Sequence, residues 1–469
     1  MKTSCVILCG GSGERLWPIS SKDEPKQFLQ INKVSLIENA ILRAKEIDSE
    51  IQIVFVCNLS SKEVIKKIAK KQKLKKPFFI IEPSRKDTGP AIIFATKLIE
   101  DKFGSTRVLV LPSDQFVKKI NKFKYDFIKA EKKLDDESIL IFGKKPDHPS
   151  TEFGYFKTQK NTNKVLEFKE KPKIKIAKRY FKNDIFFWNC GMFFFKSDYV
   201  LEAYQEHNRK NYFQIIKAYE SSSLLRRELI LDEASFKKIK SESFDYSLME
   251  KIHNIKYQKI SFDWSDIGNW NELKNHALKS HKKNYLNIVD GNTVLEDSER
   301  NIIFKNGSEK QFIILGVDNL IIAEKNNKFL ISKRDNTHKI KNSLKKLENN
   351  SYLNSLGEEV HRPWGKYKTI SLGKDFQVKV IEVHPGQSLS LQMHQKREEH
   401  WQVLDGKAEV YLDNKIYDLQ KGEKIFIPKK SKHRLTNKSK NNLVLLETQF
   451  GSYLGEDDIK RFEDIYGRK

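Results

Sequence analysis

Residues 5–29 read CVILCGGSGERLWPISSKDEPKQFL, and this stretch decides the fold of the chain. Its apolar start at residues 6–8 predicts a buried parallel strand that ends in a glycine-rich loop. The loop glycines are Gly10, Gly11 and Gly13. They let backbone N–H groups approach a phosphate closely, because no Cβ stands between. Arg15 and Lys26 add two positive charges beside the same loop, as a bound triphosphate requires.

The loop taken alone leaves a plain turn as the alternative. It follows neither GxGxxG nor GxxxxGK[ST], the two standard phosphate-binding patterns. Apolar runs predict strands at residues 6–9, 51–57, 78–83 and 108–114. Amphipathic segments between them predict helices at residues 36–47, 61–71 and 90–100. This alternation predicts an α/β domain of right-handed βαβ units, with the ligand at the carboxyl ends of the strands, where the loop lies.

Length and cysteine usage predict the general class of the protein. A chain of 469 residues is too long for one ordinary core, so two or three domains are expected. No apolar run approaches the about 20 residues needed to cross a bilayer. The N-terminus lacks the features of a signal peptide, and the four cysteines, without CxxC spacing, indicate reduced thiols. These features predict a cytoplasmic protein without a membrane partner.

The chain is strongly basic, with 87 Lys and Arg against 62 Asp and Glu and a formal net charge of +25. This excess makes nucleic-acid or other polyanion binding one hypothesis. The lysines are scattered, as in KKIAKKQKLKK and KNSLKKLENN, rather than gathered with aromatic residues on one element. No nucleic-acid partner is therefore expected, and the charge favours small anionic substrates such as nucleotides and sugar phosphates.

The C-terminal residues 361–469 predict a second, all-β domain with a metal site. They carry both cupin patterns, Gly386-x5-Gln392-x-His394-x4-Glu399-x6-Gly406 and then Gly422-x5-Pro428 followed by His433. Four ligand-type side chains stand at these spacings: Gln392, His394, Glu399 and His433. Such a set can hold Zn²⁺ or another divalent ion inside a β-barrel and leave one position open for substrate.

The intact N-terminal string GGSGERLWP…PKQFL resembles the signature of sugar-nucleotide pyrophosphorylases, specifically the mannose-1-phosphate guanylyltransferase branch. Further segments are similar to this family, namely EPSRKDTGPA at residues 82–91, LPSD at 111–114, FKEKP at 168–172, WNCGMF at 188–193, FDY at 244–246 and WSDIGNW at 264–270. The chain departs from the family at Asp87, Gly89 and Cys190, where Asn, Ala and Ser are usual.

The resemblance implies a role for each matching residue. Triphosphate binding falls to Gly10, Gly11, Gly13, Arg15 and Lys26, with Arg15 and Lys26 catalytic, and further nucleotide binding to Glu82 and Arg85. Sugar-phosphate binding falls to Gly154, Glu170, Lys171 and Asn189, and Mg²⁺ binding to Asp114 and Asp266. Without the resemblance, either aspartate is more typical of a turn or helix cap, with Asp266 heading a helix through residue 278. Glu170 and Lys171 alone are more typical of a solvated face.

The framework HRPWGKY…FQVKVIEVHPG…LSLQMH…EEHW, ending in YLGEDDIKRFEDIYGR, is similar to the type II phosphomannose isomerase domain. The resemblance implies a bifunctional, homo-oligomeric enzyme. One site would join GTP and mannose 1-phosphate into GDP-mannose, and the other would convert fructose 6-phosphate to mannose 6-phosphate, with Arg461 catalytic. Gln395 and Lys396 replace two family histidines, so a monofunctional transferase with a structural cupin is the alternative. Arg461 is otherwise typical of a surface ion pair on a terminal helix.

These patterns divide the chain into four parts. Residues 1–283 form the Rossmann-like nucleotidyltransferase domain. Short alternating runs with Gly, Asn and Asp turns make residues 284–335 a small all-β unit, which in the family is a partial β-helix. Residues 336–360 are expected to be a short helix and linker, and residues 361–469 the cupin barrel.

Overall fold

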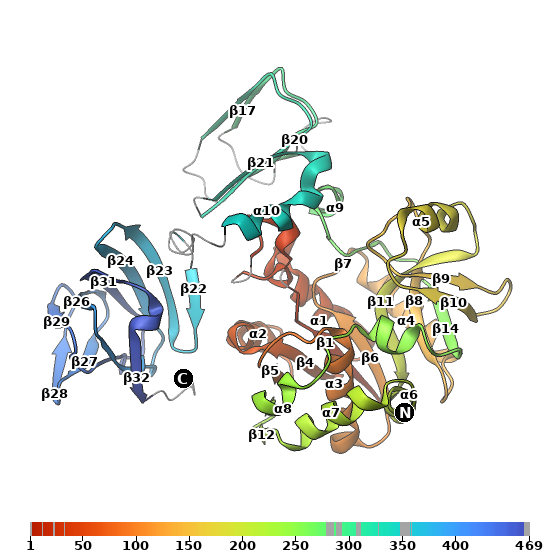
Figure 1. Ribbon diagram of the computed structural model, residues 1–469, viewed down its shortest axis with the longest axis horizontal. Coiled ribbons are helices and arrows are strands. Elements are labelled where there is room, and N and C mark those ends of the chain that lie inside the picture. Colours follow the sequence, from red (N-terminus) through yellow and green to blue (C-terminus); the bar gives the residue numbers. More distant parts are fainter. Residues whose placement is uncertain are drawn as a thin grey trace. The chain divides into compact units, whose positions relative to one another are not determined.

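The computed structural model describes residues 2–11, 13–21, 24–31, 33–277, 286–287, 293–305, 311–326, 328–347, 357 and 359–463. The chain forms two compact units (Figure 1). The first consists of Met1–Ile288 with Glu299–Ile302, and the second of Val289–Ser298 with Ile303–Lys469. Among the described residues, no helix combines the length and the apolar character needed to cross a membrane.

The first unit is built on a parallel sheet made by the four predicted strands, which are confirmed. These are β1 (Thr3–Leu8), β4 (Gln52–Asn58), β5 (Phe78–Glu82) and β6 (Arg107–Pro112). β1 lies between β4 and β6 and is parallel to both, and β5 continues the sheet beyond β4. Since all four run the same way, their carboxyl ends meet at one edge, where the glycine loop begins.

Further strands extend this sheet on both sides. They are β8 (Ile139–Lys144), β9 (Tyr155–Thr158), β10 (Val165–Lys169), β11 (Phe186–Lys196), β12 (Ser223–Leu225), β13 (Glu228–Ile230) and β14 (Ile255–Lys259). β11 runs antiparallel to β6 and carries the sheet on to β9 and β8. Over the described ranges, the sheet has 11 strands. Short strand pairs lie beside it, β2 (Gln30–Ile31) with β3 (Val34–Ser35) and β7 (Phe116–Val117) with β15 (Trp264–Ser265).

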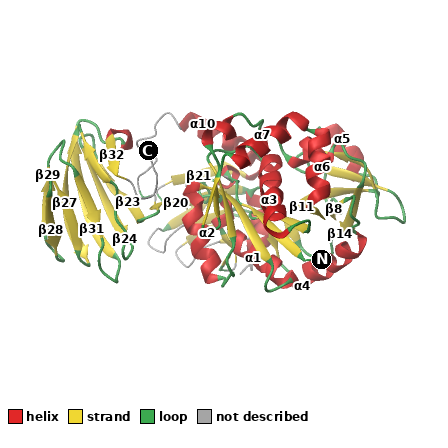
Figure 2. Cartoon of the chain, turned by 90° about the horizontal axis from the view of Figure 1, so that it is seen from below, coloured by secondary structure: helices red, strands yellow, loops and turns green. Residues whose placement is uncertain are grey.

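Helices cover both faces of the sheet (Figure 2). One layer is α1 (Leu36–Ile47), α2 (Leu59–Lys71) and α4 (Ile120–Lys133); the other is α3 (Thr88–Phe103), α6 (Ser197–His207), α7 (Arg209–Glu220) and α8 (Glu233–Lys237). Strand residues alternate between two cores, so Val6 packs with the α3 layer while Ile7 packs with the α1 layer. The predicted helices 36–47, 61–71 and 90–100 are confirmed as α1, α2 and α3. A Rossmann-like α/β domain results, as expected.

Shorter helical elements complete this unit. They are η1 (Glu14–Leu16), η2 (Lys26–Phe28), α5 (Ile174–Phe181), the π-helix η3 (Asp245–Met249) and α9 (Trp270–Ala277). η1 and η2 both lie in the 5–29 stretch, so the chain makes two short helical turns between the glycine loop and the end of this stretch.

Short strands follow in the segment where a β-helix-like unit is expected. They are β16 (Leu286–Asn287), β17 (Thr293–Glu296), β18 (Ile302–Lys305), β19 (Phe312–Leu315), β20 (Leu320–Lys325) and β21 (Lys328–Lys333). β17 and β19 pair in parallel, whereas β20 and β21 form an antiparallel hairpin. Two helices follow, η4 (Arg334–Lys339) and α10 (Ile340–Leu347). Of the helix and linker predicted at residues 336–360, residues 348–356 and 358 lie outside the described residues.

The C-terminal part is an all-β cupin fold of two sheets, as expected. The larger sheet orders β22 (Glu359–Arg362), β23 (Gly365–Leu372), β24 (Phe376–Val383), β31 (Leu443–Gly451), β26 (Arg397–Asp405) and β29 (Lys424–Ile427). The smaller orders β28 (Lys415–Leu419), β27 (Ala408–Leu412), β30 (His433–Thr436), β25 (Leu391–His394) and β32 (Ile459–Glu463). Apolar side chains between the sheets form a core of their own, which includes Trp401, Val403 and Leu445.

The alternative interpretation of Arg461 as a residue of a terminal helix is wrong. A single turn, η7 (Glu456–Asp458), leads into strand β32, which contains Arg461. β32 pairs with β25 and places Arg461 opposite Gln392. The acidic residues EDD form only the single turn η7. The residues after them form a strand because they pair with β25, a partner that the local sequence does not reveal.

Candidate functional site

The glycine loop and Lys26 are packed against each other. Gly13 has φ of +63°, a conformation that favours glycine, and it is the residue immediately before η1. A Cβ placed on Gly13 would lie 2.2 Å from the Cβ of Lys26, so only glycine permits this approach. Lys26 is 5% exposed, although lysine is normally a surface residue. The loop therefore holds a buried ammonium group next to the carboxyl ends of β1 and β6.

The Lys26 ammonium lies between the two predicted magnesium ligands. Its Nζ is 2.9 Å from Asp114 Oδ2, and it also donates to the backbone oxygen of Asp266. Burial raises the pKa of Asp266, and the carboxylates of Glu272 and Asp114 raise it further. Neighbouring carboxylates are oxygen ligands of the kind that Mg²⁺ prefers. Asp114 and Asp266 thus fit a divalent cation.

Asp266 does not head a helix, so the capping alternative is wrong. Its Oδ1 accepts a hydrogen bond from Gly268 N at 3.0 Å within a tight turn. α9 begins only at Trp270, and its cap is Asn269, whose Oδ1 accepts from Glu272 N at 3.0 Å. The Asp266 carboxylate is therefore not committed to a helix terminus.

A cavity of about 440 Å³ opens beside the glycine loop. Its lining includes Gly10, Gly11, Glu82, Arg85, Asp87, Asp114 and Asp245. Glu82 ends β5, is 8% exposed, and its Oε1 has no hydrogen-bond partner among the described residues. Burial raises the pKa of Glu82 to about 8, against the lowering effect of Arg85. A buried carboxyl group with a free acceptor marks this cavity as a ligand site.

The predicted sugar-phosphate residues form a connected group beside that cavity. Gly154 lies so close to Glu170 that a Cβ would stand 2.4 Å from Glu170 Oε2. Glu170 pairs with Lys171 at 2.9 Å, and Asn189 accepts from Gly191 N at 3.0 Å while its amide donates to Asp245 Oδ1 at 2.9 Å. Burial, followed by the Glu170 charge, raises the pKa of Asp245.

Asp245 is a residue that sequence reasoning missed as a member of the site. It contacts Asn189 and also lines the cavity, so it joins the two halves of the site. The signal was present, because Phe244-Asp245-Tyr246 matches a family segment.

The Arg15 side chain does not join the other residues predicted to bind the triphosphate. Its guanidinium instead forms an ion pair with Glu152, and both side chains are about half exposed. Nothing in the local sequence signals this partner, which lies 137 residues away.

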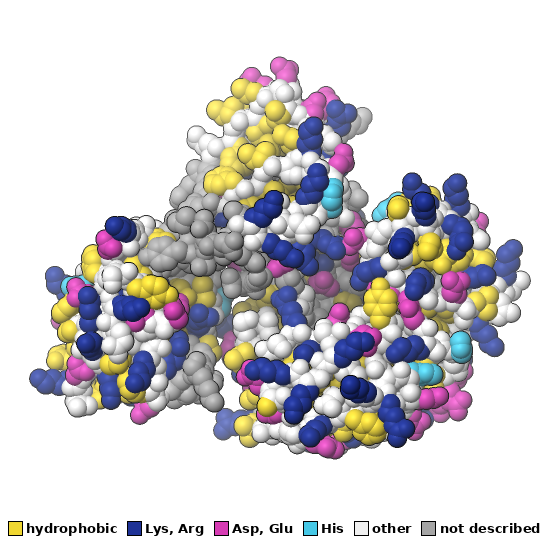
Figure 3. Space-filling view, viewed as in Figure 1, with side chains coloured by type: hydrophobic (Ala, Val, Ile, Leu, Met, Phe, Trp, Pro, Cys, Tyr) yellow, Lys and Arg dark blue, Asp and Glu magenta, His cyan; other side chains and the backbone are white. Residues whose placement is uncertain are grey.

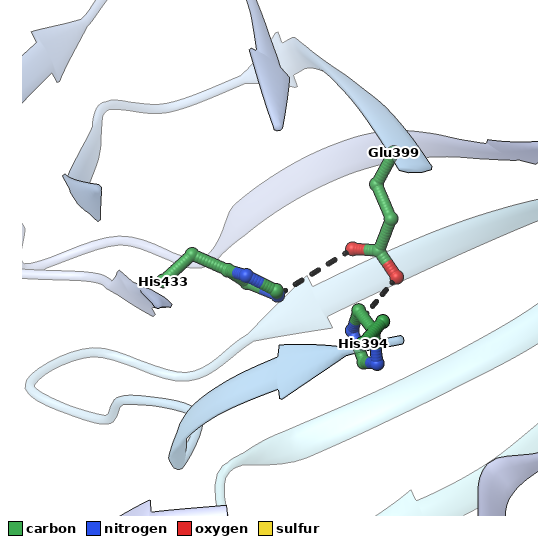
Figure 4. A group of neighbouring side chains, drawn as sticks. All are labelled: His394, Glu399 and His433. Carbon is green, nitrogen blue, oxygen red and sulfur yellow. Dashed lines mark ion pairs between the residues drawn. The ribbon is translucent and has the colours of Figure 1, made fainter. Parts of the chain in front are cut away.

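In the cupin barrel, three of the four predicted ligands converge (Figure 4). The ligand atoms of His394, Glu399 and His433 all lie within 4.8 Å of one another, and all three residues are buried. His433 donates from Nδ1 to the carbonyl oxygen of Ser431 at 3.0 Å, which leaves the Nε2 lone pair facing Glu399. His394 Nδ1 has no hydrogen-bond partner in the described part of the chain. Two imidazoles and a carboxylate of this kind fit a divalent metal.

Neighbouring side chains hold Glu399 in place. Trp401 Nε1 donates to its Oε2 at 3.0 Å, while Arg397 Nε and Gln449 Nε2 donate to its Oε1 at 3.2 and 3.0 Å. Burial opposes ionisation, but the ion pair with His394 at 3.1 Å and the charge of Arg397 keep the pKa of Glu399 well below its ordinary value. The carboxylate is therefore fixed and ionised.

Gln392 and Arg461 lie beside this group. Gln392 Nε2 is 3.5 Å from His433 Nε2, and its Oε1 accepts from Ser390 at 3.1 Å. A cavity of about 50 Å³ is lined by Gln392, Glu399 and Arg461 together. Gln395 and Lys396, by contrast, are exposed in the turn between β25 and β26, and their backbone amides donate to Asp458. The two family histidines that they replace would therefore lie outside the buried group.

Comparison with known families agrees with this arrangement. The family model described as Nucleotidyl transferase matches residues 4–283, more than half of the chain. The chain belongs to this family. A second model, Mannose-6-phosphate isomerase C-terminal, matches residues 349–464, so the family member carries an isomerase-type domain after its transferase domain.

Relatives match this nucleotidyl transferase over nearly its whole length. The alginate biosynthesis protein AlgA of Pseudomonas fluorescens is 34% identical, over 99% of this chain and 96% of the relative. The xanthan biosynthesis protein XanB of Xanthomonas campestris pv. campestris strain B100 is 33% identical, over 99% and 98%. The mannose-1-phosphate guanylyltransferase RfbM of Salmonella typhimurium is 33% identical, over 98% and 97%.

A solved structure supports the fold of this family member. A Thermus thermophilus protein described as a mannose-1-phosphate geranyltransferase superimposes with a TM-score of 0.63 at 23% identity. The match covers 74% of this chain and all of that protein. At this identity it shows the shared fold alone.

Proposed function

We propose that the first unit joins GTP and mannose 1-phosphate into GDP-mannose and releases pyrophosphate. The observation that carries this proposal is the meeting of Lys26, Asp114 and Asp266 at the glycine loop. The buried Lys26 ammonium contacts Asp114, which also lines the cavity, and the backbone of Asp266; these contacts support a triphosphate site at the edge of the cavity. Full-length similarity to a mannose-1-phosphate guanylyltransferase supports the choice of substrates.

The chain's own residues would act by positioning and by neutralising charge. An oxygen of mannose 1-phosphate attacks the α-phosphorus of GTP, a P–O bond forms, and the bond to the β-phosphate breaks with its electron pair leaving on pyrophosphate. Gly10, Gly11, Gly13 and Lys26 would hold the triphosphate, with Arg15 joining them once it leaves Glu152. Asp114 and Asp266 would hold Mg²⁺, which neutralises phosphate charge when bound. Glu170, Lys171, Asn189 and Gly154 would bind the sugar phosphate.

Within this proposal, Glu82 and Arg85 bind the nucleotide, and Glu82 recognises guanine. The free Glu82 Oε1 in the cavity can accept from the N1–H and amino group of guanine, whereas adenine lacks a donor at N1. Burial of this carboxyl group is costly without a partner, so its retention is consistent with a ligand that supplies donors.

Replacing Glu82 by Gln should therefore lower activity and raise stability. We expect kcat/KM for GTP to fall about 10- to 100-fold, because the guanine donors favour the ionised form of Glu82 and a hydrogen bond to a charged group contributes about 1.5–3 kcal/mol. The preference for GTP over ATP should narrow. The Glu82 pKa is raised to about 8, so folding loses stability as pH rises from the ordinary value of 4.5 towards 8. Glu82→Gln avoids this loss. The unfolding free energy of Glu82→Gln should therefore exceed that of the unaltered chain by an amount that grows from pH 4.5 to pH 8, up to about 5 kcal/mol.

Turnover with GTP and ATP, and melting temperatures at pH 5 and pH 8.5, measure both effects. Glu137→Gln, an exposed carboxyl group in the same unit, serves as the matched control. Equal GTP selectivity in Glu82→Gln and the unaltered chain would remove Glu82 from base recognition.

We also propose that the cupin domain converts fructose 6-phosphate to mannose 6-phosphate. Support comes from the buried His394, Glu399 and His433 group and from the match to an isomerase family model. With Gln392 these residues would hold Zn²⁺ or another divalent ion, which polarises sugar oxygens when bound. Arg461 on β32, opposite Gln392 on β25, would face the same substrate. The exposed turn position of Gln395 and Lys396 removes the main sequence argument for a purely structural cupin.

A polyanion-binding function gains no support from the charges on the face that Figure 3 draws. On the face drawn in Figure 3, Lys and Arg side chains are scattered over both units and mixed with Asp and Glu. We propose the domain boundaries 1–283, 284–335, 336–360 and 361–469 for the transferase, β-helix-like, linker and cupin parts.

A turnover panel tests the proposed function. GTP, ATP, UTP and dTTP are each combined with mannose 1-phosphate and glucose 1-phosphate, and a coupled assay follows fructose 6-phosphate with added Zn²⁺, Co²⁺ or Mn²⁺. We expect highest turnover with GTP and mannose 1-phosphate, and isomerisation in the coupled assay. Absence of the first reaction rejects the transferase, and absence of the second leaves a monofunctional enzyme.

A further inference from the structure

The turn that presents Asp266 contains an unusual backbone conformation. Ile267 has φ of +48° and is completely buried, although a β-branched residue is disfavoured there. Such a conformation persists only where the surroundings impose it. Ile267 N donates to Ser265 Oγ, and Gly268 N to Asp266 Oδ1, both at 3.0 Å. Contacts with neighbouring residues must therefore stabilise this turn.

Glu272, in the first turn of α9, makes that connection. Its Oε2 accepts from Ser265 Oγ at 2.9 Å and from Gly268 N at 3.3 Å. Its Oε1 accepts from Asn269 Nδ2 at 3.1 Å. The Glu272 carboxylate thus bonds to Ser265 before Asp266 and to Gly268 and Asn269 after it. It also orients the Ser265 hydroxyl, whose oxygen accepts the hydrogen bond from Ile267 N.

Sheet pairing alone does not fix Asp266. β15 pairs with β7 through Trp264 and Ser265, which lie opposite Val117 and Phe116. This register directs the chain after Ser265 back towards Asp114, but the pairing ends one residue before Asp266. From there on, the contacts of Glu272 determine where the Asp266 carboxylate points relative to Asp114 and Lys26.

We infer that Glu272 is a positioning residue that sets the geometry of the cation site between Asp114 and Asp266. The inference rests on the proposed transferase function for the identity of that site. Residues that orient metal ligands typically change metal affinity about 10- to 100-fold when removed. Glu272→Gln keeps the shape of the side chain but replaces one carboxylate oxygen by an NH2 group, so it can accept either from Ser265 and Gly268 or from Asn269, but not from both sides.

The rival explanation is that Glu272 only stabilises the start of α9. Asn269 Oδ1 accepts from Glu272 N, and Glu272 Oε1 accepts from the Asn269 side-chain amide, so the pair resembles a capping box in which the side chain replaces the backbone donor. Asn269→Ala removes the bond from Glu272 N and the bond to Oε1, but it leaves the bonds to Ser265 and Gly268. It is the matched control for a purely helical role.

Mn²⁺ titration of the full-length chain, followed by electron paramagnetic resonance, tests the inference. Two Mn²⁺ sites are expected, one in each domain. The site that disappears in Asp266→Asn is the transferase site, and the site that remains is the cupin site. At that site we expect Glu272→Gln to raise Kd about 10-fold or more and to raise the KM for Mg²⁺ more than it lowers kcat at saturating Mg²⁺. Asn269→Ala should lower the melting temperature and leave Mn²⁺ Kd unchanged.

Each contrary outcome has a distinct meaning. Wild-type Mn²⁺ affinity in Glu272→Gln, with loss in Asp266→Asn, overturns the role of Glu272 and leaves the proposed function intact. Unchanged Mn²⁺ binding in Asp266→Asn overturns both the metal role and this inference, while the turnover panel still decides the activity. Should Glu272→Gln fail to fold, Ser265→Ala cuts the same connection from the other side and must raise Kd in the same way.

Discussion

Lys26→Ala should lower kcat/KM for GDP-mannose formation by about 10²- to 10³-fold, the usual cost of losing an electrostatic stabiliser of the transition state. The Lys26 ammonium is buried, lies 2.9 Å from Asp114 Oδ2 and bonds to the Asp266 backbone. In this dry position its charge is little screened, so its effect on phosphate charge is larger than that of a surface lysine. Coupled pyrophosphate release measures the loss, and the fructose 6-phosphate reaction should be unchanged.

The same variant has a predictable effect on stability. Without the ammonium, Asp114 and Asp266 repel each other, so the melting temperature should fall and added Mg²⁺ should restore it without restoring turnover. Lys122→Ala, an exposed lysine of α4, is the matched control and should change neither property. Undiminished GDP-mannose synthesis by Lys26→Ala would exclude Lys26 from the triphosphate site.

His433→Ala should abolish the isomerase reaction and leave the transferase intact. His433 is one of three buried groups whose ligand atoms lie within 4.8 Å, and a site with one ligand fewer binds a divalent metal weakly. The coupled fructose 6-phosphate assay measures activity, and elemental analysis measures metal per chain. Isomerase activity and metal content per chain should fall together.

His400→Ala provides the matched control for this experiment. His400 lies on β26 of the same barrel, but it is exposed and packs against Phe426 and Phe450 instead of the metal group. It should retain both metal and isomerisation. A His433→Ala chain that still isomerises with full metal content would contradict the assignment of the cupin site.

The sequence by itself determined the fold class and the types of residue at each site. Strand and helix periodicity is local, so residues 6–9 and 51–57 could be identified as strands β1 and β4 without any tertiary information. The spacing of His394 and Glu399 is equally local, since a turn between two strands fixes both positions. Family motifs supplied the remaining candidates.

Tertiary structure decided how those residues meet. Lys26 reaches Asp266 across 240 positions of sequence, and Arg15 pairs with Glu152 across 137. Such contacts depend on strand order and register, which local propensity does not specify. From the sequence alone, Asp266 could be interpreted as a helix cap and Arg461 as part of a terminal helix. The pairing of β32 with β25 decided the question for Arg461. For Asp266 it was decided by the start of α9 at Trp270, with Asn269 as its cap. Neither outcome follows from local propensity, because strand partners and exact helix starts depend on the folded surroundings.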